Sequence, residues 1–176
     1  NANNFLKLLN KTKISISNDD TRHYLNGIFL HLTESSGRNF LTAVATDSHR
    51  LSSSSIEVKN SNEFNSLILP RKTVYQLCSL LSETQGKINM QFNENKIKFT
   101  IGNIELVSKV IDGKFPDYKK VVPVENKKTL IVPSDEFIKS IERVMSVSID
   151  RKEGVKLAIN SDRIHFSVNS ANSGEG

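Results

Sequence analysis

The chain has 176 residues, of which 37% are apolar and 24% charged, with a formal net charge of +5 and a pI near 9.3. No apolar run approaches the roughly eighteen residues of a membrane span. Walker, Gly-x-Gly-x-x-Gly and Cys/His zinc motifs are absent from the sequence, so we expect neither a cofactor nor a metal ion. The single cysteine, Cys78, excludes an internal disulfide, and the positive charge permits a polyanionic partner without identifying one.

The chain opens with a helix pattern. Asn4 can cap a short helix in which Phe5, Leu8 and Leu9 recur at helical spacing. The alternation over residues 14–17, Ile-Ser-Ile-Ser, then predicts a short strand.

A pair of strands follows. Tyr24 to Leu32 predicts one strand, residues 34–37 a turn, and Phe40 to Ala45 the partner strand. The short polar residues 46–48 then favour a turn, which presents the next side chains at a strand end, where functional residues are common.

This strand end, Thr46 to Leu51, allows three interpretations. Asp47, Ser48 and His49 are the residue types of a hydrolase triad, but sequence neighbours on an extended strand point to opposite faces and no nucleophile elbow is present. An ordinary turn with a structural histidine is the second interpretation, because such composition is common in turns. The third is a recognition site.

Two later segments repeat one pattern. Leu67-Ile68-Leu69-Pro70 recurs as Leu130-Ile131-Val132-Pro133, and each predicts a strand that stops at a proline able to begin a helix. Ser134 or Asp135 can cap the second helix. The apolar stripes of the two helices are Val74, Leu77, Cys78 and Leu81, and Phe137, Ile141, Val144 and Met145. A hairpin pattern follows each helix, over residues 88–101 and 155–168.

Repetition of a helix plus antiparallel strands predicts an α+β fold in which the helices gather on one face of the sheets. The opening helix and the strands up to Ala45 form an earlier, divergent copy of the unit. One unit cannot bury both a helix stripe and a sheet face alone, so we expect neighbouring units to pack together. Because the first residue is Asn and the last six resemble an arbitrary cut, we expect a fragment of a longer protein.

Three segments in order carry a resemblance to one known family. Residues 46–51, Thr-Asp-Ser-His-Arg-Leu after an apolar strand, resemble the Thr-Asp-Gly-His-Arg-Leu signature of the bacterial sliding clamp, the beta subunit of DNA polymerase III. Residues 21–27, Thr-Arg-His-Tyr-Leu-Asn-Gly, and residues 112–123, Asp-Gly-Lys-Phe-Pro-Asp-Tyr-Lys-Lys-Val-Val-Pro, match the same family in the same order. The match covers nearly the whole chain.

The resemblance implies a DNA-clamp fold with three similar domains per protomer, each built from two helix-plus-strand units. Two protomers close into a ring, with helices lining the hole and sheets outside. It makes residues 1–118 the middle domain, 119–126 a connecting strand and 127–176 the N-terminal half of the third domain. It also implies a cytoplasmic, non-catalytic subunit of a DNA polymerase holoenzyme, a processivity factor with no membrane partner.

The resemblance further implies sequence-independent contact with duplex DNA. The candidate DNA-facing cations on the helices are Lys7, Lys11, Arg71, Lys72, Lys139 and Arg143, and for each of them a solvated surface charge is an equal alternative. The turn after Asp19 adds Arg22 and Tyr24. In that turn His23 replaces an aromatic residue of the family and Asp19 repels phosphate, so the turn departs from the family pattern.

The second implied role is docking of linear peptides from polymerase and clamp-loader subunits, by an apolar floor with a few polar groups. The pocket residues carried over are Leu25, Thr46, Ser48, His49, Arg50, Leu51, Pro116, Lys120 and Val121. Ser48 replaces a glycine, and Lys120 replaces an arginine and loses its planar set of donors. The rest of the third domain would supply the far wall, so we expect the chain to carry part of the pocket.

Two alternatives remain. One is a hydrolase that uses Ser48 and His49, which ester or peptide turnover dependent on His49 would support. The other is a repeat scaffold without a nucleic-acid role, which unchanged anisotropy of labelled duplex DNA would support.

The resemblance implies a homodimeric ring for the full-length protein, joined between first and third domains, and we expect this fragment to be a monomer.

Overall fold

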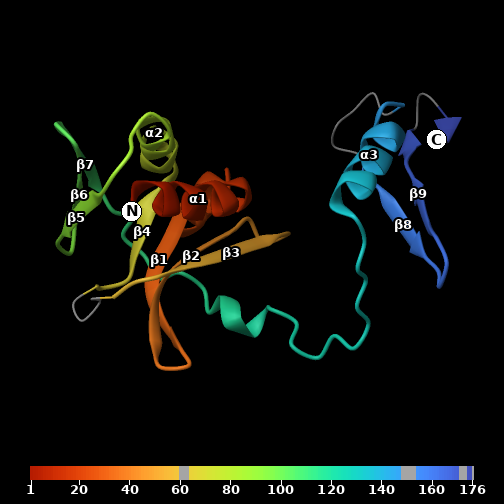
Figure 1. Ribbon diagram of the computed structural model, residues 1–176, viewed down its shortest axis with the longest axis horizontal. Coiled ribbons are helices and arrows are strands. Elements are labelled where there is room, and N and C mark those ends of the chain that lie inside the picture. The colour runs from red at the N-terminus through yellow and green to blue at the C-terminus, as the bar shows by residue number, and fades with distance from the viewer. Residues whose placement is uncertain (60–63, 148–153, 171–173, 176) are drawn as a thin grey trace. The chain divides into compact units, whose positions relative to one another are not determined.

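The computed structural model describes residues 1–59, 64–147, 154–170 and 174–175. They belong to two compact units, Asn1–Lys119 and Lys120–Gly176, each with its own helices and sheets (Figure 1). Within the described residues, no helix combines the length and the apolar character needed to cross a membrane.

The first unit contains two antiparallel sheets. Strands β1 (Gly27–Ser35), β2 (Arg38–Thr46), β3 (Leu51–Glu57) and β4 (Leu67–Pro70) form a sheet of order β3-β2-β1-β4. Strands β5 (Ile88–Phe92), β6 (Lys96–Ile101) and β7 (Ile104–Lys109) form the second in chain order. A single bridge, with the Ile111 N–H donating to the Ile68 carbonyl over 2.9 Å, links β4 to the chain that follows β7.

Helices α1 (Ala2–Thr12) and α2 (Arg71–Ser82) lie side by side over one face of the four-stranded sheet (Figure 1). Both predicted stripes are buried, including Leu8 of α1 and Leu77 of α2. Cys78 faces the same core, and burial raises the pKa of its thiol above the ordinary value. Phe99 of β6 is fully buried, with its ring centroid 6.2 Å from that of Phe5. The core therefore lies between the helix pair and the sheets.

The first unit is built from two copies of one pattern. The Arg71 N–H at the start of α2 donates to the carbonyl of Asn26, just before β1, over 2.9 Å. The Ala2 N–H at the start of α1 makes the equivalent 2.8 Å bond to the carbonyl of Gly86, just before β5. The succession α1–β1–β2–β3 thus recurs as α2–β5–β6–β7, which confirms the predicted repeat of a helix with antiparallel strands.

Three expectations near the N-terminus are wrong. Asn1 caps α1, since its Oδ1 accepts a 2.9 Å bond from the Asn3 N–H, and Asn4 lies inside the helix. Residues 14–17 form no strand, because Lys13–Ser15 continue as a 3₁₀ turn, η1, and Ser15 Oγ bonds Ser52 Oγ at 2.7 Å. Tyr24 belongs to the 3₁₀ segment η2 (Asp20–Leu25), so β1 begins only at Gly27.

The second unit contains α3 (Ser134–Met145) and the antiparallel pairs β8 (Lys156–Ile159) with β9 (Ile164–Ser167), and β10 (Asn169–Ser170) with β11 (Gly174–Glu175). The predicted stripe of α3 is its less exposed face. In particular, the Phe137 ring lies edge-on to that of Phe166 of β9, with centroids 5.3 Å apart. The third helix-plus-hairpin copy is therefore present in this unit.

The segment before α3 differs from expectation. Neither residues 119–126 nor residues 130–133 form a strand; Tyr118–Lys120 form a 3₁₀ turn, η3, and Ile131 is 91% exposed. A strand forms only where a neighbouring strand can hydrogen-bond its backbone. Here β8 pairs with β9, and none of the described residues pairs with residues 121–133. Pro133 precedes α3, and neither Ser134 nor Asp135 caps it through its side chain.

Candidate functional site

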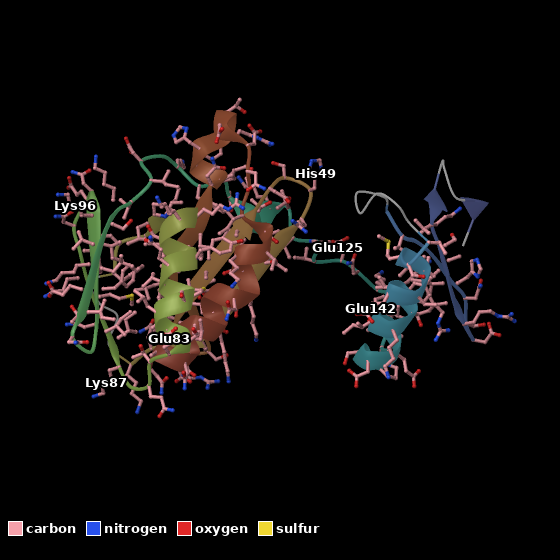
Figure 2. All side chains as sticks on the ribbon, turned by 90° about the horizontal axis from the view of Figure 1, so that it is seen from above. His49, Glu83, Lys87, Lys96, Glu125 and Glu142 are labelled. Atoms are coloured by element: carbon pink, nitrogen blue, oxygen red, sulfur yellow. The ribbon has the colours of Figure 1, made fainter. Side chains whose placement is uncertain are left out.

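The turn between β2 and β3 is fixed by its own side chains. Thr46 pairs with Leu51 in the sheet, and its Oγ1 donates a 2.7 Å bond to the carbonyl of Arg50. One carboxylate oxygen of Asp47 accepts 3.0 Å bonds from the backbone N–H groups of His49 and Arg50. His49 is exposed at the edge of the first unit (Figure 2). The turn therefore presents a fixed backbone with an outward-facing histidine and arginine.

Asp47 serves the turn and not a catalytic triad. Its second oxygen accepts a 3.0 Å bond from the Arg50 guanidinium. Partial burial opposes ionisation, but the backbone bonds and the Arg50 charge outweigh it, so the pKa of Asp47 lies below its ordinary value. Within the described part of the chain, no hydrogen bond joins the His49 ring to Ser48 or Asp47. The hydrolase arrangement is therefore not assembled.

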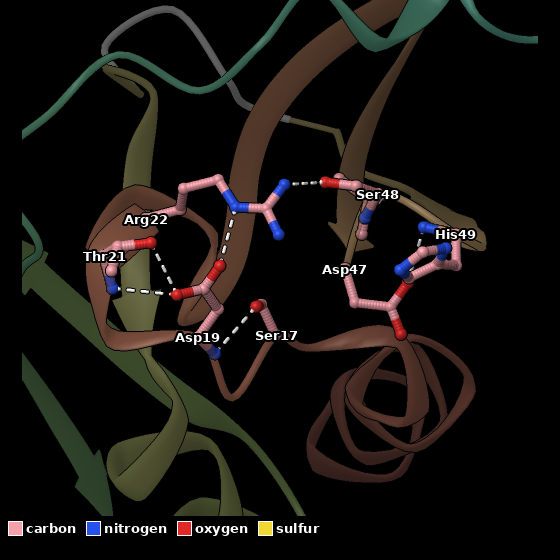
Figure 3. Close-up of polar contacts among 8 residues, drawn as sticks. Ser17, Asp19, Thr21, Arg22, Asp47, Ser48 and His49 are labelled. Atoms are coloured by element: carbon pink, nitrogen blue, oxygen red, sulfur yellow. Dashed lines mark hydrogen bonds and ion pairs between the residues drawn. The ribbon is translucent and has the colours of Figure 1, made fainter. Parts of the chain in front are cut away.

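Arg22 connects η2 to this turn (Figure 3). Its Nε donates a 2.9 Å bond to Asp19 Oδ2, and its Nη1 donates a 2.5 Å bond to Ser48 Oγ. Asp19 Oδ1 in turn accepts bonds from the hydroxyl and the backbone N–H of Thr21, which, together with Arg22, hold the pKa of Asp19 below its ordinary value. The sequence pattern presents Asp19 only as a group that repels phosphate, although its spacing of three residues from Arg22 is compatible with the ion pair that the two form.

A small apolar cluster lies next to these two turns. Leu25, Val44, Ile68 and Phe115 are buried in it, and the partly buried residues packed against them are Tyr24, Phe29, Leu51, Ile111 and Tyr118. The rings of Phe29 and Phe115 stack, with centroids 4.9 Å apart. Pro116 follows Phe115 and is exposed. The fold thus brings the segments around Leu25, Leu51 and Phe115 to one place.

The predicted pocket residues are divided between the units. Seven lie in the first unit, namely Leu25, Thr46, Ser48, His49, Arg50, Leu51 and Pro116. Lys120 and Val121 belong to the second unit, where Val121 is 70% exposed.

Four predicted DNA-facing cations share the helix layer of the first unit. Lys7, Lys11, Arg71 and Lys72 are exposed on α1 and α2, and neither helix contains a carboxylate. The Arg71 guanidinium and the Lys13 ammonium lie 5.7 and 5.5 Å from the ring centre of Tyr75. In contrast, Lys139 and Arg143 share α3 with Asp135, Glu136 and Glu142. Of the three helices, α1 and α2 therefore carry basic side chains and no acidic ones.

A cavity of the first unit shares Phe29, Ile68 and Phe115 with this apolar cluster. It has a volume of about 1410 Å³ and contains none of the nine predicted pocket residues. Its apolar wall includes Phe29, Phe64, Met90, Phe92 and Phe115, and sequence patterns gave no sign of it. Among the described residues, no group of three or more His, Cys, Asp or Glu side chains can hold a metal ion.

A histidine secures the segment that follows Phe115. His31 of β1 stacks on Phe29 at 4.6 Å, and its Nε2 lies 3.0 Å from the Tyr118 hydroxyl. Its Nδ1 is buried without a hydrogen-bond partner among the described residues. Burial, together with the charge of Lys119, lowers the pKa of His31 below its ordinary value. The neutral ring is therefore the form that holds Tyr118.

This pKa shift gives a pH-dependent stability. The folded first unit binds the His31 proton less readily than the unfolded chain, because the pKa of His31 is lower in the folded state. The contribution of His31 to the free energy of unfolding is therefore fully present above the unfolded pKa of about 6.5 and is lost as pH falls below it. We expect His31→Gln to reduce the loss of stability between about pH 7.5 and 5.5, measured by urea denaturation. Val107→Ala, an exposed and non-titratable position of β7, is the control and should keep the wild-type dependence. An unchanged pH profile in His31→Gln would contradict the assignment.

Comparison with known proteins covers both units. The family model described as the DNA polymerase III beta subunit, central domain, matches residues 1–117, and the model of its C-terminal domain matches residues 119–176. The beta sliding clamp of Caulobacter vibrioides is 36% identical over 175 residues, which is 99% of this chain and 47% of that protein. The beta sliding clamp of Rickettsia bellii is 34% identical over 93% of this chain and 43% of its own length.

Solved structures agree. A crystal structure of the Caulobacter crescentus beta sliding clamp has a TM-score of 0.95 at 36% identity, and covers 99% of this chain and 47% of that one. The Bartonella birtlesii sliding clamp bound to griselimycin has a TM-score of 0.92 at 38% identity, with the same coverage. Paired helices over repeated antiparallel strands, with these matches, define a protein of the DNA-clamp fold. The chain belongs to the family of the DNA polymerase III beta subunit, the bacterial beta sliding clamp. It spans about half the length of the relatives it matches.

Proposed function

We propose that this chain is part of a DNA polymerase processivity factor, a non-catalytic cytoplasmic clamp whose full-length protomers pair into a ring around duplex DNA. The observation that carries the proposal is the ordered match of both units to one clamp family over 99% of the chain. In this proposal, residues 1–118 are the middle domain, 119–126 connect the domains and 127–176 are half of the third.

The helix layer of the first unit supports the DNA part of the proposal. Its cations, Lys7, Lys11, Arg71 and Lys72, are exposed without a carboxylate on either helix. Such a surface attracts phosphates without reading bases, as a sliding ring requires. Lys139 and Arg143 of α3 are the DNA-facing cations proposed for the second unit.

The DNA proposal is tested with the full-length protein and labelled duplex DNA at low salt. We replace four cations by Ala, namely Lys7, Lys11, Arg71 and Lys72, and expect weaker DNA binding. The plot of log K against log salt should also become less steep, by about 0.9 for each phosphate that is no longer neutralised. The control replaces the exposed Lys87, Lys96, Lys109 and Lys114, which lie outside the helices, and should leave the slope closer to wild type. Equal effects in the two variants would count against a helix-lined DNA surface.

The turn and the apolar cluster support peptide docking. Leu51 supplies partly exposed apolar surface over the buried Leu25, while Thr46, Ser48, His49 and Arg50 lie on one short turn beside it. An apolar floor beside a few fixed polar groups suits a linear peptide. In the proposal, Pro116 adds to this site, and Lys120 and Val121 are the pocket residues that the second unit carries.

Peptide docking is tested by titrating a fluorescent peptide from a replicative polymerase against the full-length protein. Arg50→Ala and Leu51→Ala should each weaken binding by about tenfold, or roughly 1.4 kcal/mol. Val107→Ala, an exposed apolar position of β7, is the control and should bind as wild type. No binding by the folded wild-type protein would refute the docking role.

A further inference from the structure

Ser48 has a backbone conformation that serine rarely adopts. Its φ is +78°, in the left-handed region that favours glycine. Ser36 also has a positive φ, but it lies in the tight β1–β2 hairpin, whose turn requires one. Ser48 lies in the longer turn between β2 and β3, and its Oγ makes the 2.5 Å bond with Arg22. A glycine would adopt this φ more easily but could not make that bond.

The Arg22 guanidinium donates hydrogen bonds from two of its nitrogens. Bidentate binding of a phosphate uses Nη1 with Nη2, or Nε with Nη2. Nη1 already donates to Ser48 Oγ, and Nε to the Asp19 carboxylate at 2.9 Å. A phosphate bound through either pair therefore competes with one of these two bonds for the guanidinium. The neutral hydroxyl is a weaker acceptor than the carboxylate, so the bond to Ser48 is displaced first.

We propose that the Arg22–Ser48 hydrogen bond makes DNA and peptide binding compete: a phosphate that takes Arg22 releases Ser48, the residue with positive φ in the turn that docks peptides. The inference rests on the proposed function, with Arg22 of η2 added as a DNA contact that the family resemblance implies, and with the Thr46–Leu51 turn facing the peptide. Arg22 lies in the segment proposed to contact DNA and Ser48 in the turn proposed to dock peptides, and each acts here as a positioning residue for the other. Because coupling between two ligands is reciprocal, peptide binding weakens DNA binding by the same factor.

The test measures affinity for the fluorescent polymerase peptide with and without saturating short duplex DNA, using the full-length protein at low salt. In wild type, DNA should weaken peptide binding by about fivefold or more. Ser48→Gly keeps the backbone conformation and removes the hydroxyl, so the effect of DNA on peptide affinity should disappear. The same variant removes the bond that competes with phosphate for Arg22, so DNA should bind more tightly while the salt slope stays close to that of wild type.

Ser36→Gly is the matched control, since it makes the same change at the other positive-φ serine, on the exposed hairpin. It should keep the wild-type coupling. Two results overturn the inference: wild type binds both ligands without mutual effect, or Ser48→Gly keeps the full effect of DNA, which would indicate direct steric exclusion. If folded wild type binds neither ligand, the proposed function fails and the inference fails with it.

Discussion

Replacing Gly27 by Ala should destabilise the first unit by about 3 kcal/mol or more. Gly27 is buried at the start of β1, where it pairs with Pro70 of β4. A Cβ at this position would overlap the carbonyl oxygen of Leu69 and lie 3.0 Å from Ile68 Cγ2. The obstacle is backbone of the adjacent strand, so the clash is relieved only by opening the β1–β4 pairing, which also positions the start of α2.

Tyrosine fluorescence during urea denaturation measures this effect selectively. Tyr24, Tyr75 and Tyr118 all lie in the first unit, and the sequence contains no Trp. Gly102→Ala is the control: its φ is +60° and open space surrounds it, so it should lose only about 1–2 kcal/mol from backbone strain. Equal losses at Gly27 and Gly102 would show that the close approach to β4 carries no cost of its own.

Replacing Phe99 by Ala should remove about 3–5 kcal/mol from the free energy of unfolding of the first unit. Phe99 is fully buried on β6 and packs near Phe5 of α1, so its removal leaves a cavity between the helix layer and the second sheet. The loss includes both the transfer free energy of the ring and the cavity that the rigid neighbours cannot fill.

Val107→Ala is the comparison for Phe99→Ala. Val107 lies on β7 of the same sheet but is 58% exposed, so its truncation should change stability by no more than about 0.5 kcal/mol. Both are measured by the tyrosine signal in urea. A Phe99→Ala loss as small as that of Val107→Ala would mean that the second sheet does not share the core with α1.

Local pattern was sufficient for the repeated elements. The apolar stripe that ends at Leu81 is the buried face of α2, and residues 88–101 form the predicted hairpin, because side-chain periodicity alone decides which face of a helix or strand is apolar. The turn from Thr46 to Leu51 was also found from sequence, since short polar residues directly follow a buried strand. The family resemblance came from the order of three such segments.

The remaining features of the fold and the site depend on contacts between residues that are distant in sequence. Residues 130–133 carry the same strand pattern as β4, but among the residues that the structure describes only β4 has a strand to pair with. Strand formation depends on a neighbouring strand that the local sequence cannot specify. The contact of Arg22 with Ser48, and that of His31 with Tyr118, also join residues far apart in the chain. The sequence by itself therefore determined the elements, their repetition and the family. Only the tertiary structure decided which side chains meet, because those meetings follow from how the strands and helices pack.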